Sequence, residues 1–169
     1  MTSTFNNGHK EFVGVPALLE KHQQQWIEFD RWLSMRDWLS FHSNHYDWWA
    51  FPIDKPSSYG FSYTVFADEI NQMMKDEGFM RRHQIGAGFL LLSWGWSLDN
   101  EPVKNPEANQ TWANWPIRLA KCARSMWLFG QEQQFESCVA YANYLRSIDT
   151  SFVYNGRDLF NEIVNPHNY

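Results

Sequence analysis

The chain has 169 residues, of which 44% are hydrophobic and 18% aromatic, and its formal net charge is -5 at pH 7. This length suits one domain that buries enough surface to fold without a metal ion or a disulfide. The acidic balance argues against nucleic-acid-binding proteins, which usually carry a basic surface. The apolar runs are too short to span a bilayer and no signal segment opens the chain, so we expect a cytoplasmic protein without a membrane partner.

Residues 1–14 are predicted to form a flexible N-terminal segment, because the stretch from Met1 to Lys10 is polar. Residues 15–169 are predicted to form a single helical domain. Its first helix covers about residues 17–41, where Trp26, Phe29 and Leu33 recur at spacings of three and four.

Five further segments have helical patterns: about 65–77, 79–96, 116–129, 131–148 and 157–164. Gly78 is expected to end the first of these, and Pro116 to begin the third. A strand would fit only at 60–65 or 151–155. Five to six helices without a clear strand pattern predict an all-α, single-domain helical bundle.

The helix predicted over residues 79–96 is apolar almost all round, which is typical of a central, buried helix. Gly86 and Gly88 each lower its helix propensity by roughly 1 kcal/mol relative to alanine. We therefore expect a neighbouring helix or an indole ring to approach closely at these positions. An apolar helix in so small a chain also leaves a symmetric homodimer open.

The segment from His42 to Tyr63 is rich in aromatic residues and contains Pro52, Pro56 and Gly60. Prolines remove backbone donors and restrict the residue before them. The segment is therefore predicted to be an ordered loop that contains no regular element.

Within this segment the run Asn44-His45-Tyr46-Asp47-Trp48-Trp49-Ala50-Phe51-Pro52 resembles the signature of the opioid growth factor receptor conserved region. Tyr46, Trp49, Phe51 and Pro52 match that signature, whereas its histidine falls on Asn44 and its glutamine on Trp48. Later elements follow in a similar order, so the resemblance covers about residues 32–148. It implies an all-helical fold with no established enzymatic activity, and it supplies no catalytic residues.

Eight of the ten tryptophans fall into two groups, one in helical stretches and one, Trp48 and Trp49, in the aromatic segment. Six lie in helical stretches and are expected to be mostly in the core: Trp26, Trp32, Trp38, Trp94, Trp96 and Trp127. Our leading hypothesis is a non-enzymatic helical interaction module without a cofactor. It would bind a protein partner in a groove between the aromatic segment and the helix over 79–96, through Tyr46, Trp48, Trp49 and Tyr59.

The first alternative is a small metal-dependent enzyme that uses His42, His45 and Asp47. Imidazole and carboxylate bind zinc or iron, and a spacing of three places both histidines on one face if the helix continues that far. We favour the simpler interpretation that these residues close the end of the first helix and bond to loop carbonyls.

The second alternative is a single-stranded nucleic-acid binder, with bases stacked on exposed tryptophans and phosphates on Arg81 and Arg82. The basic cluster at 81–83 and the cluster formed by Arg118, Lys121 and Arg124 are more simply predicted to be solvated helix faces. Cys122 and Cys138 fall in different predicted helices and are expected to be reduced, partly buried thiols.

Overall fold

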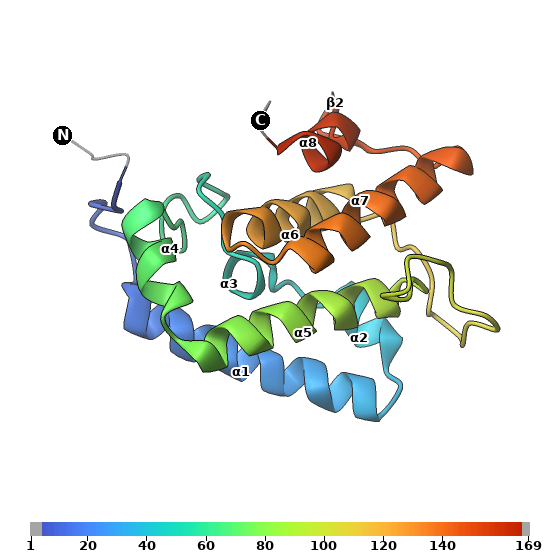
Figure 1. Ribbon diagram of the computed structural model, residues 1–169, viewed down its shortest axis with the longest axis horizontal. Helices are drawn as coiled ribbons and strands as arrows, with labels where there is room; N and C mark the ends of the chain where they lie inside the picture. The colour runs from blue at the N-terminus through green and yellow to red at the C-terminus, as the bar shows by residue number, and fades with distance from the viewer. Residues whose placement is uncertain (1–4, 167–169) are drawn as a thin grey trace.

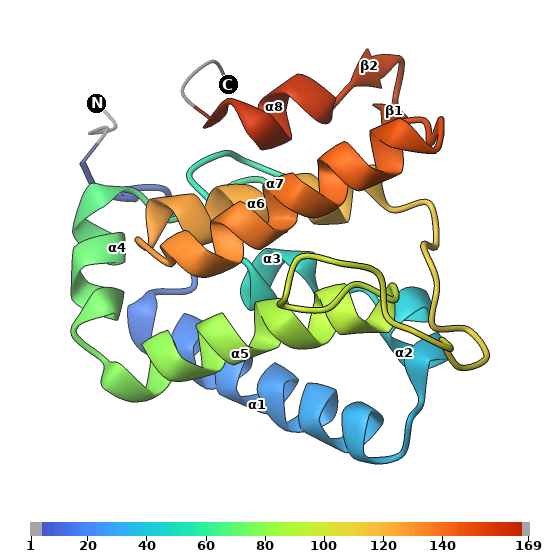
Figure 2. The same cartoon turned by 45° about the vertical axis from the view of Figure 1, so that its right-hand side comes forward.

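A computed structural model describes residues 5–166, which form eight helices and one two-stranded sheet. The predicted all-α class is therefore confirmed. Two long helices, α1 (Val15–Ser34) and α5 (Glu77–Ser93), form one layer, and α6 (Pro116–Leu128) and α7 (Glu132–Ser147) form a second layer above it (Figure 1). The short α8 (Phe160–Val164) covers the outer side of α6 and α7 (Figure 2).

The helix predicted over residues 17–41 is in fact two helices, α1 and α2 (Trp38–Ser43). Arg36 between them has a φ of 55°, in the left-handed region that a continuing helix does not use. The Asp37 side chain then caps α2 by accepting a hydrogen bond of 3.2 Å from the Ser40 backbone N–H. The apolar spacing crosses this break unchanged and so does not reveal it.

The segment predicted to be a loop contains the one-turn helix α3 (Asp47–Ala50) before its first proline. The next two helices, α4 (Ala67–Met74) and α5, meet at Asp76, whose carboxylate accepts from the Phe79 backbone N–H at 3.0 Å. This cap starts α5 at Glu77, so the prediction that Gly78 ends the preceding helix is wrong.

The C-terminal part holds an antiparallel hairpin of β1 (Val153–Tyr154) and β2 (Arg157–Asp158). Strand β1 lies within residues 151–155, one of the two ranges where the sequence allows a strand. The other, 60–65, contributes only an isolated bridge between Gly60 and Ser57. Because Arg157 and Asp158 belong to β2, the last helix begins at Phe160 and is shorter than predicted.

The core lies between the two helical layers and contains Trp32, Trp38, Trp94 and Trp96, as predicted. Trp26 and Trp127, also assigned to the core, are only half-buried. Cys122 and Cys138 are fully buried free thiols with their sulfur atoms 3.8 Å apart, so they are more buried than expected. The predicted neighbour is present at Gly86, where an added Cβ would make an ordinary contact of 3.6 Å with the Phe29 ring of α1. At Gly88 the neighbour is neither a helix nor an indole, because the added Cβ would lie 3.2 Å from the Leu98 side chain in the loop after α5.

The segment predicted to be flexible, residues 1–14, lies partly outside the described residues, at 1–4. Asn7 Nδ2 donates to the carbonyl oxygens of Phe61 and Thr64 at 2.9 and 2.8 Å, and the Val13 N–H donates to Ser62 O at 3.0 Å. These bonds attach residues 7–13 to the segment before α4. Across residues 5–166, none of the helices combines the length and apolar character that crossing a membrane requires.

Candidate functional site

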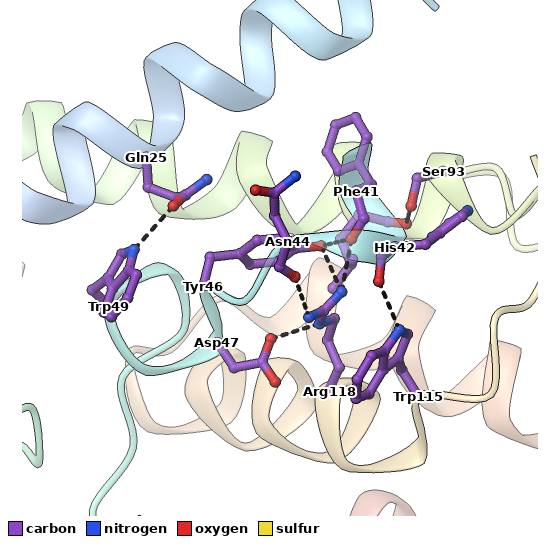
Figure 3. A network of polar contacts seen from close by, with 11 residues as sticks. Gln25, Phe41, His42, Asn44, Tyr46, Asp47, Trp49, Ser93, Trp115 and Arg118 are labelled. Atoms are coloured by element: carbon purple, nitrogen blue, oxygen red, sulfur yellow. Dashed lines mark hydrogen bonds and ion pairs between the residues drawn. The ribbon is translucent and has the colours of Figure 1, made fainter. Parts of the chain in front are cut away.

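Arg118 on α6 fixes the aromatic segment to the upper layer (Figure 3). Its side chain is 0% exposed, and its Nε donates to Asp47 Oδ1 at 2.6 Å. Its two terminal nitrogens donate to the carbonyl oxygens of Phe41 and Asn44, each at 2.7 Å. The prediction of a solvated face is therefore wrong for Arg118, and also for Arg124, which is buried and paired with Asp54 at 2.7 Å.

These bonds satisfy backbone groups that the short helices leave without partners. Phe41 lies in the last turn of α2 and Asn44 is its C-cap, where carbonyl oxygens have no intrahelical donor. Asp47 is the first residue of α3, where a negative charge favours the helix dipole. The guanidinium lies between the Tyr46 and Trp115 rings, with its central carbon 4.2 and 4.7 Å from their centres. One buried cation thus orients α2 and α3.

His42, His45 and Asp47 do not converge on a common point. His42 Nε2 bonds to the Asn109 carbonyl at 2.7 Å, and burial lowers the pKa of this imidazole. His45 is exposed and meets the edge of the Trp115 ring, while Asp47 is paired with Arg118. No group of three side chains able to hold a metal ion occurs anywhere in the described range 5–166. The metal-dependent alternative therefore has no site there.

Of the four residues predicted to contact a partner, Tyr46 lies apart from the others. It is 0% exposed; its hydroxyl donates to the Phe41 carbonyl and lies 3.1 Å from Arg118 Nη1. Burial raises the pKa of this phenol well above its usual value. In this position Tyr46 supports Arg118 and cannot touch a partner.

Trp48, Trp49 and Tyr59 do come together at the surface. The Trp48 and Tyr59 rings meet edge to face with centres 4.8 Å apart, and Tyr59 is 48% exposed. Trp49 turns toward α1, where its indole N–H donates to Gln25 Oε1 at 3.0 Å. The Lys21 Nζ of the same helix lies 4.2 Å from the Trp49 ring centre. Trp49 therefore packs against α1, whereas the sequence predicts a groove between the aromatic segment and α5.

Trp48 forms one wall of a cavity of about 490 Å³ between the aromatic segment, α6 and the β1–β2 hairpin. Its lining residues include aromatic rings and cations in similar number: Trp48, Trp115 and Tyr154, with Lys55, Lys121 and Arg157. Lys121 Nζ lies 5.0 Å from the Trp48 ring centre, and burial lowers the pKa of this ammonium group. Arg81 and Arg82, the cations of the nucleic-acid alternative, do not line this cavity.

The sequence contains a signal for part of this cavity. Trp115, Arg118 and Lys121 recur at a spacing of three and therefore share one face of a helix. An aromatic residue on that face distinguishes it from a purely solvated one. Arg157 has no comparable signal, because only the folding of the hairpin brings it near α6.

An aromatic cavity with several cations is suited to a ligand that combines an apolar surface with negative charge. Comparison with known proteins identifies no relative: no family model, no curated protein and no solved structure matches the chain.

Proposed function

We propose that the chain is a non-enzymatic interaction module that binds a protein partner at the cavity between the aromatic segment, α6 and the hairpin. The observation that carries the proposal is the half-buried Trp48, which lines a cavity of about 490 Å³ and packs edge to face against the exposed Tyr59. Tryptophan and tyrosine are enriched among the residues that dominate binding energy in protein interfaces. The resemblance to the opioid growth factor receptor conserved region, which implies no established enzymatic activity, supports the non-enzymatic part of the proposal.

The Asp47 and Arg118 side chains beside the cavity support a binding role because both have structural tasks. The Asp47 carboxylate is paired with Arg118, and Arg118 holds the carbonyl oxygens of α2. A general base or nucleophile must instead be able to reach a substrate. The half-buried indole and lysine side chains supply contact area and charge.

A cross-linking experiment tests the proposal in two steps. Tyr59 is replaced by the photoreactive benzoylphenylalanine, and Met35, which is 65% exposed between α1 and α2, is replaced in a matched control. Irradiation in an extract of the source cells is expected to give a protein adduct from position 59 and none from position 35. The captured protein is then identified and purified.

Binding of that purified partner is measured for the wild type and for Trp48→Ala. We expect a loss of at least about tenfold in affinity, which corresponds to about 1.4 kcal/mol. Unchanged secondary structure and melting temperature would show that the variant is folded. Equal adducts from positions 59 and 35, or equal affinity of wild type and Trp48→Ala, would refute the proposed surface.

A further inference from the structure

The distribution of charge around the cavity is opposite to that of the whole chain. The chain has a formal net charge of -5. The cavity, by contrast, is lined by Lys55, Lys121 and Arg157 and by one carboxylate, that of Asp47. Because Asp47 is paired with the buried Arg118, its charge is already balanced inside the protein. The cavity is therefore a local positive site on an acidic molecule.

Lys121 is the cation that this arrangement leaves most unbalanced. It is half-buried and takes part in none of the six ion pairs found among residues 5–166. Its ammonium group lies over the Trp48 ring, 5.0 Å from the ring centre. Removing an ammonium group from water costs free energy, and burial lowers the pKa of Lys121 although the charge of the nearby Asp47 acts to raise it. An anion in the cavity would offset that cost.

Arg157 lines the same cavity from strand β2. Its Nε lies 3.3 Å from Glu162 Oε1, and its side chain is 57% exposed, so it is held only at the surface. A guanidinium group can bind a carboxylate or phosphate with two parallel hydrogen bonds. The three cations come from three separate elements: the loop after α3, helix α6 and strand β2. A ligand bridging them would join these elements.

We propose that this cavity recognises an anionic side chain in an acidic segment of the partner, with the charge between Lys121 and Arg157 and adjacent apolar atoms on Trp48 and Trp115. This inference rests on the proposed function, since it names the chemistry of the partner bound at that site. A carboxylate of glutamate or aspartate and a phosphorylated serine share this chemistry. The binding experiment distinguishes the two sources.

Three short peptides, acetylated and amidated at their ends, serve as probes. They have the same length and the same central leucine, and carry two glutamates, two glutamines or two phosphoserines. Affinities for the full chain are measured by calorimetry at low and at physiological salt. We expect the glutamate or the phosphoserine peptide to bind at least tenfold more tightly than the glutamine peptide, and salt to weaken that binding.

Lys121→Gln is expected to remove most of this preference for the charged peptide. Lys75→Gln is the matched control, because it changes the same charge at an exposed position after α4, and it should leave the affinity within twofold. Arg157→Gln is a second test at an exposed side chain, in case Lys121→Gln does not fold. In the wild type, NMR titration of the Lys121 ammonium group should show its pKa rise when the charged peptide is bound.

Equal binding of the charged and glutamine peptides would overturn the inference. So would an unchanged preference for the charged peptide in both Lys121→Gln and Arg157→Gln. A tenfold preference for phosphoserine over glutamate would identify phosphate as the source of the anion, and the reverse preference a carboxylate. If the cross-linked partner depends on Trp48 but not on Lys121, the proposed function stands and the anionic recognition falls. If charged peptides bind while no Trp48-dependent partner exists, the proposed function falls instead.

Discussion

Arg118 shows how much of this site depends on one buried residue. Its guanidinium reaches Asp47 and the Phe41 carbonyl, which lie 71 and 77 positions away in the sequence. A local pattern of basic residues gives no information about such distant partners, and for this reason the sequence predicts a solvated face. Arg118 becomes buried only in the folded chain, where its side chain reaches α2 and α3.

We expect Arg118→Met to lower the free energy of unfolding by about 3–5 kcal/mol, because it leaves Asp47 buried without a partner. Urea unfolding followed by circular dichroism measures this loss. Adding Asp47→Leu should cost less than the two single substitutions together, since the double variant contains no unpaired buried charge.

The exposed pair between Arg146 and Asp158 provides the matched control for Arg118. Its atoms are 3.5 Å apart and its side chains are 49% and 50% exposed. Surface pairs of this kind contribute about 0–1 kcal/mol, so Arg146→Met should have a small effect. A comparable loss in both variants would contradict the assignment of Arg118 as the anchor of α2 and α3.

At the scale of helices and turns, apolar spacing predicts the presence of a helix more accurately than it predicts the residues at which the helix begins and ends. It places helices correctly over most of α1, α5, α6 and α7, whereas the ends depend on single residues such as Asp37 and Asp76. Each of these aspartates accepts from a backbone N–H three residues later, and such a cap fixes the start of a helix. The apolar period contains no information about caps.

Two glycines of the α5 region are predicted to respond oppositely to alanine. At Gly86 an added Cβ would make an ordinary contact of 3.6 Å with the Phe29 ring, inside a helix where alanine is preferred. We expect Gly86→Ala to raise the free energy of unfolding by about 0.5–1 kcal/mol. Thermal and urea unfolding are the measurements.

Gly95, just beyond the end of α5, is the contrasting position. Its φ is +84°, and an added Cβ would lie 3.0 Å from the backbone oxygen of Gln110. Gly95→Ala is therefore expected to destabilise the chain, because it combines a strained backbone with a close contact to main chain. A stabilising Gly95→Ala would contradict the close contact with Gln110, and a destabilising Gly86→Ala would contradict the ordinary contact with Phe29.

For the whole molecule, composition and spacing correctly predict an all-α bundle with tryptophans in its core. The candidate site is predicted only in part, because Trp48 and Tyr59 come from the aromatic segment, whereas Lys121 and Arg157 approach it through tertiary folding.

The same folding places two histidines at the junction of both helical layers. His22 of α1 bonds to the Trp49 carbonyl at 3.0 Å, and His83 of α5 bonds to Ser125 Oγ of α6 at 2.8 Å.

These two histidines are expected to make global stability depend on pH. Burial lowers the pKa of His22 to about 4, with a smaller contribution from the nearby Arg82, and it lowers the pKa of His83 well below 6.5. In the unfolded chain both groups take up a proton as the pH falls through 6.5, while in the folded chain both stay neutral. The unfolded state then binds more protons, so the free energy of unfolding decreases as the pH falls from 6.5 toward 4.

Each histidine contributes up to about 1.4 kcal/mol per pH unit, or about 2.7 for both, within this range. Urea unfolding at intervals between pH 8 and pH 5 measures the slope above the range in which most carboxyl groups titrate. The stability should be constant above pH 7 with respect to these groups and fall below 6.5. His22→Gln retains an amide that can donate to the Trp49 carbonyl but does not titrate, and it should reduce the slope by up to about 1.4 kcal/mol per pH unit. The remaining slope comes from His83 and from His42, whose pKa burial also lowers. If the variant and the wild type lose stability equally between pH 6.5 and pH 5, His22 is not a source of the acid sensitivity.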